Sequence, residues 1–258
     1  MKKILFLGYS EKRTSLINSL KNLDNISLER TSRKINKEYS KRFDFIISFG
    51  YRHKISKDII QNVKRPIVNL HMGYLPFNKG AHPNFWSFID NTTSGVTIHE
   101  IDSNIDTGNI IFQRQCDFNL TNNIKKLTFR NTYDHLFNEI EKLFDENINN
   151  IVNYNYKTYK QYGKGSFHKR DELPQILKQW DQNIYKTILR YNKQYKKYVK
   201  NKLDIINEIE NTRKSNNVNW MNIIRTSFKN SPNETLKILK SINEDDNKIS
   251  KLFSELNK

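Results

Sequence analysis

Apolar residues gather in short runs along the first 115 residues, and helix-like stretches separate the first runs. Three nearly continuous apolar runs predict strands that are buried on both faces, at 3–8, 44–50 and 67–70. Between and after them, apolar residues at helical spacing predict helices over 13–23, 56–63 and 82–89. Ser56 is a suitable N-cap for the second of these helices. This alternation predicts an α/β fold with a doubly wound, mostly parallel, Rossmann-like sheet.

The pattern changes towards the C-terminus. Residues 94–101 and 108–115 predict two further strands, and Ile124, Leu127, Leu136 and Ile140 predict a helix over 121–147. From residue 181 onwards an apolar stripe predicts a long helix, and Ser231 with Glu234 forms a capping-box pattern before a last helical segment that includes 249–256. We therefore expect an α/β domain over 1–155, a connecting segment over 156–180 and an all-helical C-terminal region over 181–258.

The composition is that of a polar protein without membrane segments. Hydrophobic residues make up 36% of the chain and the mean hydropathy is −0.80, and no window approaches the ~18 uncharged apolar residues of a membrane span. The start, MKKILFLGYS, has a shorter apolar run than the ~7 to 15 residues of a signal peptide, so it predicts a first strand instead. The single cysteine, Cys116, excludes an internal disulfide and argues against a structural metal site, so we expect a cytoplasmic protein that holds no metal.

The net charge of +17 is spread along the chain. Residues 1–159 carry 23 Lys and Arg against 16 Asp and Glu, and residues 160–258 carry 21 against 11, without a long uninterrupted basic run. Such a distribution indicates anionic ligands, and phosphorylated small molecules fit it as readily as RNA does. The abundance of Lys, Asn and Ile fits the nucleotide composition of a source genome equally well.

Two short motifs carry residues suited to catalysis. The triplet N-L-H at 69–71 ends the third apolar run, and D-T-G at 106–108 lies in a turn between two expected strands. Ligands bind at the carboxyl ends of the strands in such sheets, so both motifs can border one cleft. There Asn69 can stabilise an oxygen that gains negative charge, His71 can accept a proton from an amine, and Asp106 can orient the imidazole. An isolated Asn-x-His after a strand is more commonly a cap or an ordinary hydrogen-bonded histidine.

The combined motif resembles the catalytic signature of the folate-dependent formyltransferases. N-L-H is followed by L-P and a glycine, and D-T-G comes about 35 residues later. The resemblance covers roughly residues 1–120, and it implies that Asn69, His71 and Asp106 match the catalytic residues of that family. The finer form, NLHMGYLPFNKGAHPNFWSFI followed by GVTIHEID, is more similar to the sugar N-formyltransferases than to the tRNA enzyme. Gly73 and Asn109 depart from the serine and aspartate that are usual in the family.

The resemblance also implies the ligands and their contacts. The formyl donor would be N10-formyltetrahydrofolate, and its pterin would lie against residues on two segments, namely Phe49, Gly50, Tyr51, His99, Ile101 and Asp102. The acceptor would be the amine of a dTDP- or UDP-linked amino sugar used for surface polysaccharide. Its candidate contacts are Tyr74, Lys79, Trp86 and His168. For Trp86 a core position is the simpler interpretation, and Lys79 and His168 also fit solvated surface charges.

Two other functions stay open at this point. A methionyl-tRNA formyltransferase would use the positive charge to bind tRNA. Enzymes of that kind are longer chains with a β-rich C-terminal domain. A catalytically silent scaffold would use the helical region instead. The apolar stripes of that region favour self-association into a homo-oligomer, and we expect neither nucleic acid nor a membrane as a partner.

Overall fold

The structure of the protein is a computed structural model that describes residues 1–118, 126–174 and 180–256, with the side chains at 198–199, 202, 213, 215–217 and 249–256 left aside. The expectations for Ile124 and for the side chains of 249–256 lie outside the described residues. By its internal contacts the chain divides into two compact units, Met1–Asn192 and Lys193–Lys258.

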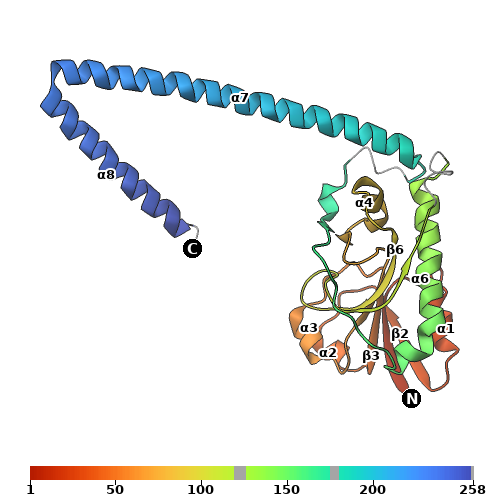
Figure 1. The fold of residues 1–258 in the computed structure, drawn as a ribbon. Coiled ribbons are helices and arrows are strands. Elements are labelled where there is room, and N and C mark those ends of the chain that lie inside the picture. The colour runs from red at the N-terminus through yellow and green to blue at the C-terminus, as the bar shows by residue number, and fades with distance from the viewer. Residues whose placement is uncertain (119–125, 175–179, 257–258) are drawn as a thin grey trace. The chain divides into compact units, whose positions relative to one another are not determined.

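A six-stranded sheet forms the centre of the first unit (Figure 1). Its strands are β1 (Lys2–Gly8), β2 (Ile26–Thr31), β3 (Phe45–Phe49), β4 (Val68–His71), β6 (Gly95–Glu100) and β7 (Ile110–Gln115), in the spatial order β2-β1-β3-β4-β6-β7. β2, β1, β3 and β4 pair in parallel, whereas β6 pairs antiparallel with both β4 and β7. The expected α/β fold with a mostly parallel sheet is confirmed.

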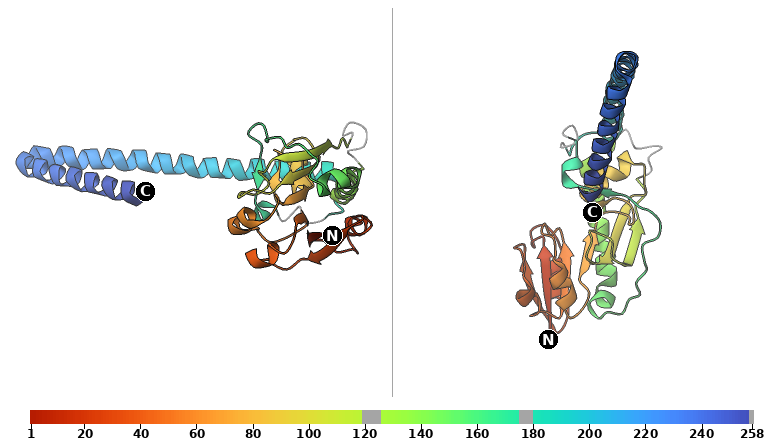
Figure 2. Two further views of the ribbon diagram at one scale, coloured as in Figure 1. Left: turned by 90° about the horizontal axis from the view of Figure 1, so that it is seen from below. Right: turned by 90° about the vertical axis from the view of Figure 1, so that its left-hand side faces the viewer.

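Helices cover both faces of this sheet (Figures 1 and 2). Successive residues of a strand point to opposite faces. Accordingly, Ile4 and Phe6 pack in the core with α1 (Leu16–Lys21) and α6 (Phe129–Val152), whereas Leu5 and Leu7 pack in the second core with α3 (Lys57–Asn62). The short helices α2 (Lys37–Ser40) and α4 (Pro83–Ile89) also belong to this unit. The strands therefore need apolar side chains on both faces, which explains their continuous apolar runs.

The sequence pattern does not predict the strand β2 or the helix α2. β2 lies at the sheet edge and buries its residues only partly, so Ile26 and Leu28 alternate with exposed polar residues and leave a weak signal. The four-residue helix α2 follows it. Helix α6 begins at Phe129, after a capping box between Thr128 and Asn131, so residues 126–128 precede it, and the part of the expected helix at 121–125 lies outside the described residues.

The connecting segment folds back onto the α/β unit. Residues 167–168 form strand β8, which pairs with β5 (Lys79–Gly80), and Tyr159 bridges to Ile110. A 3-10 helix at Arg170–Glu172 follows. The first compact unit includes this segment and runs to Asn192.

Two helices account for the C-terminal region. α7 spans Ile184–Asn230, and α8 spans Pro232–Leu256, with a turn at Ser231 between them (Figure 2). Both carry exposed apolar side chains, among them Ile205, Ile209 and Ile223 on α7. Within the described ranges, no helix combines the length and the apolar character that crossing a membrane requires.

Candidate active site

A cavity of about 670 Å³ opens at the carboxyl ends of β3 and β4. Its lining comes from the turn after β3, from β4, from β6 and the loop that follows it, and from the segment around β8. Ligand pockets in proteins have volumes of roughly 300 to 1,000 Å³. The described part of the chain thus places a cavity of ligand size at the edge of the sheet where the two sequence motifs meet.

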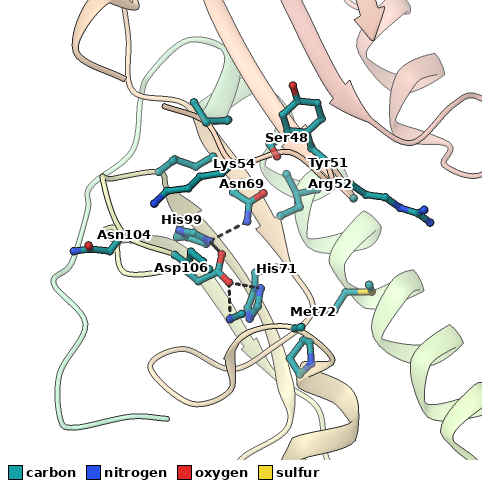
Figure 3. A pocket seen from close by; sticks show the side chains of 18 of the residues that line it. Ser48, Tyr51, Arg52, Lys54, Asn69, His71, Met72, His99, Asn104 and Asp106 are labelled. Atoms are coloured by element: carbon teal, nitrogen blue, oxygen red, sulfur yellow. Dashed lines mark hydrogen bonds and ion pairs between the residues drawn. The ribbon is translucent and has the colours of Figure 1, made fainter. Parts of the chain in front are cut away.

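Strand geometry brings Asn69, His71 and His99 to one face of the sheet. Asn69 and His71 are two residues apart on β4, so their side chains point the same way. Asn69 is directly opposite His99 in the antiparallel pair of β4 and β6. The Nδ2 atom of Asn69 lies 3.1 Å from the Nε2 atom of His99, and Figure 3 shows this contact beside His71.

Asp106 enters the same site from the turn between β6 and β7 (Figure 3). Its Oδ2 atom accepts a hydrogen bond from the backbone N–H of Gly80 at 2.9 Å and lies 3.6 Å from Nδ1 of His71. Its Oδ1 atom lies 3.5 Å from Nε2 of His99. The amide, the imidazole and the carboxylate expected from the two motifs therefore meet in one place.

The turn is tight because the chain crosses itself closely after Asp106. A Cβ atom on Gly108 would lie only 1.8 Å from the carbonyl oxygen of Glu100. Asp106 itself has a positive φ of 53°, a conformation that aspartate adopts more readily than most residues. The glycine of D-T-G is thus required by the close approach of two backbone segments.

Burial and charge set the protonation of the site. Burial lowers the pKa of His71, which is 7% exposed, and the carboxylate of Asp106 opposes that effect only in part. Burial raises the pKa of Asp106, but the neighbouring His71 imidazole and the Gly80 N–H outweigh it and hold that pKa well below its usual range. Near neutral pH the site therefore combines an uncharged, proton-accepting His71 with an ionised Asp106.

Little space surrounds the Nε2 nitrogen of His71. Nε2 is buried and has no hydrogen-bond partner among the described residues. A Cβ atom on Gly73 would lie 2.6 Å from it. A serine at residue 73, which is usual in the folate-dependent formyltransferases, would collide with the His71 ring in this position. The glycine leaves room for the ring.

The connecting segment holds the Asp106 turn from outside. The side-chain Nε2 of Gln161 donates to the backbone oxygen of Asp106 at 2.8 Å and to that of Gly108 at 2.9 Å. β8 pairs with the strand that contains Gly80, whose N–H binds the carboxylate. Both supports come from contacts that span large sequence separations, and sequence reasoning missed them.

The expected ligand contacts divide into two groups. Most of them line the cavity together with the catalytic candidates, namely Phe49, Gly50, Tyr51, His99, Ile101, Asp102 and His168. Tyr74, Lys79 and Trp86 lie outside this lining. Trp86 is 5% exposed and packs in a core cluster, with its ring stacked on His168 at 4.1 Å between centroids. The assigned roles of both groups stay predictions.

Further basic side chains and histidines line the cavity. Arg52, His53 and Lys54 come from the turn after β3, and His82, Lys169 and Arg170 come from the segments that follow β5 and β8. Within the described ranges, no three His, Cys, Asp or Glu side chains gather in a way that would hold a metal ion.

Comparison with known proteins identifies the family. The family model described as formyl transferase matches residues 12–134. The solved structure of the formyltransferase PseJ from Anoxybacillus kamchatkensis is 38% identical, with a TM-score of 0.64 over 72% of this chain and 97% of that one. The chain belongs to the formyltransferase family. PseJ was crystallised with UDP-4,6-dideoxy-4-formamido-L-AltNAc and tetrahydrofolate.

Two other members of the formyltransferase family are similar over shorter stretches. An N-formyltransferase from Helicobacter canadensis, solved with folinic acid and dTDP-3-aminofucose, is 25% identical, with a TM-score of 0.56 over 67% of this chain and 72% of that one. A dTDP-4-amino-4,6-dideoxyglucose formyltransferase from Mycobacterium bovis is 42% identical over 79 residues, or 31% of this chain. That match spans 33% of the curated relative.

Replacing Gln161 tests whether it supports the Asp106 turn. Gln161→Leu keeps the approximate size but removes the donor to two backbone oxygens, so we expect the free energy of unfolding to fall by about 1 to 3 kcal/mol. Urea unfolding of the full chain measures this change. Gln61→Leu, at an exposed residue of α3, is the matched control. Equal unfolding midpoints for the two variants would contradict the role of Gln161.

Proposed function

We propose that the protein transfers a formyl group from N10-formyltetrahydrofolate to the amine of a dTDP- or UDP-linked amino sugar for surface polysaccharide. The observation that carries this proposal is the meeting of Asn69, His71 and Asp106 at the cavity. The similarity to PseJ over nearly the whole of that protein supports it, as do the folate and nucleotide-sugar ligands of the related structures.

The residues around the cavity fit a folate. Its walls include apolar side chains, such as Phe49, Ile55 and Ile101, together with the backbone of the turn at 49–52 and of the loop at 101–106. Apolar walls with a few convergent polar groups are typical of sites for planar cofactors. When bound, the folate supplies a formyl carbon that an amine can attack. Phosphate and carboxylate groups of the ligands would find Lys54, Lys169 and Arg170 at the cavity.

Each catalytic residue has a distinct task in this proposal. Asn69 donates an N–H to the oxygen that gains negative charge as the amine adds, which stabilises that charge in a water-poor site. His71 accepts the proton that the amine loses, because burial keeps the ring neutral near pH 7. Asp106 lies beside Nδ1 of that ring, where its negative charge stabilises the imidazolium once the proton has moved. The imidazolium would then give this proton to the folate nitrogen as the bond between that nitrogen and the formyl carbon breaks, which releases tetrahydrofolate.

Other expected properties follow the same proposal. The reaction takes place in the cytoplasm, in keeping with the free, buried Cys116, and nucleic acid is not a partner. The helical character of α7 and α8 argues against a function as a methionyl-tRNA formyltransferase, because those enzymes have a β-rich C-terminal domain.

A panel of acceptors tests the function. Purified protein with N10-formyltetrahydrofolate is offered UDP- and dTDP-linked amino sugars and an initiator tRNA, and release of tetrahydrofolate is recorded. We expect turnover with a nucleotide sugar, and we expect His71→Asn to lower it by at least about 100-fold. Turnover with tRNA alone would assign the other branch of the family. Absence of turnover with every acceptor would favour a scaffold.

The pH dependence of turnover tests the state of His71. Only the neutral ring accepts a proton, and burial lowers its pKa from the usual 6.5. We therefore expect kcat to fall on the acid side with a midpoint below pH 6.5, about tenfold per pH unit beyond it. His82 lines the same cavity and is also a histidine of lowered pKa, so His82→Asn is the control and should keep the midpoint. A midpoint above pH 6.5 would contradict the assignment.

The helical region is proposed to join copies of the chain. Ile205, Ile209, Trp220 and Ile223 are exposed and lie along one stripe of α7. Placing charge on that stripe with Ile209→Glu and Ile223→Glu together should lower the mass measured by light scattering in solution. Asn207→Glu with Asn211→Glu, on exposed residues of another face, should leave the mass unchanged. A parent protein that is already monomeric would refute this proposal.

A further inference from the structure

His99 is buried at the base of the active site and contacts two of the three catalytic residues. Its side chain is 1% exposed. Nε2 lies 3.1 Å from the amide nitrogen of Asn69 and 3.5 Å from the carboxylate of Asp106. The contact with Asn69 follows from the register of β4 and β6, which sets these two residues directly opposite each other. Cross-strand pairs of this kind have their side chains within interaction range.

The other ring nitrogen determines the protonation of His99. Nδ1 lies 2.7 Å from the backbone oxygen of Glu100, and a carbonyl oxygen can only accept, so Nδ1 carries a proton. In the neutral ring, Nε2 then holds a lone pair and accepts from the amide of Asn69. An imidazolium would instead turn an N–H towards the N–H groups of Asn69. The shorter of the two Nε2 distances, the one to Asn69, agrees with the neutral form.

This hydrogen bond fixes the orientation of the side-chain amide of Asn69. The amide nitrogen faces His99 and the amide oxygen faces away from it (Figure 3). If the amide were reversed, its oxygen would face the lone pair of Nε2, and both atoms would be acceptors. Asn69 also lines the cavity, so the hydrogen bond to His99 leaves its second N–H to be donated to a ligand.

We propose that His99 is a positioning residue that acts through Asn69. Its neutral ring, held by the Glu100 carbonyl, accepts from Asn69 and so presents the remaining N–H of that amide to the oxygen that gains charge. This role rests on the proposed function of Asn69. It differs from the cofactor contact expected from the sequence, because Nδ1 and Nε2 are both engaged by the protein.

Two substitutions of similar size separate this role from a merely structural one. In His99→Gln the side-chain amide reaches as far as Nε2, so its oxygen can accept from Asn69. In His99→Asn the amide reaches only as far as Nδ1 and leaves Asn69 without its acceptor. We expect His99→Asn to lower kcat by about 10- to 100-fold, short of the 10²–10³ that loss of a whole oxyanion donor costs. His99→Gln should restore most of that loss, with the KM for the folate unchanged in both. Equal loss of kcat in the two variants, or a rise in the folate KM that matches the loss of kcat, would overturn the proposal.

A spectroscopic measurement tests His99 without turnover. The ¹⁵N resonances of its ring in the full chain at pH 7 should show a protonated Nδ1 and an unprotonated Nε2 that accepts a hydrogen bond. In Asn69→Ala the Nε2 resonance should move towards that of a free lone pair. A ring that is an imidazolium, or that carries its proton on Nε2, would refute the positioning role. Because no acceptor sugar is needed, this result is independent of whether the proposed formyl transfer is found.

Discussion

The carboxylate of Asp106 is the point on which the geometry of the site depends. It lies between the rings of His71 and His99 and accepts the N–H of Gly80. A buried carboxylate is costly unless positive or hydrogen-bonding groups surround it, and here the His71 ring on β4 and the N–H of Gly80 on β5 lie beside it. The ionised group therefore ties β4 and β5 to the turn that contains Asp106. Moving any one of them would leave a buried charge without part of its compensation.

The catalytic residues lie where two pairing directions meet. β3 and β4 are parallel and end at the cavity, as ligand-binding strands of doubly wound sheets do. β6 runs antiparallel to β4, and their register sets His99, near the end of β6, directly opposite Asn69. This register lets an asparagine on one strand and a histidine on the next share a hydrogen bond inside the site.

Sequence patterns predicted the main parts of this arrangement for identifiable reasons. Asn69 and His71 follow a run buried on both faces, and Asp106 lies in a glycine-containing turn, so local patterns were sufficient to place them at strand ends. Gln161 and the N–H of Gly80 act through a side-chain amide and a backbone group that no local pattern marks, across 55 and 26 residues. For Trp86, an aromatic residue of a short helix, the pattern could not distinguish a cavity wall from a core, and the structure puts it in a core cluster. The edge strand β2 was not predicted because half of its residues are exposed and the others are only partly buried.

Because β8 pairs with β5, the site is completed only late in the synthesis of the first unit. Residues 161–168 lie against 76–81 and the Asp106 turn, yet they follow both by more than 50 residues. During synthesis the sheet strands through β7 leave the ribosome first, and α6 comes after them. The site can only close once the segment through His168 has emerged, so a nascent chain that has already formed the sheet still lacks a closed site.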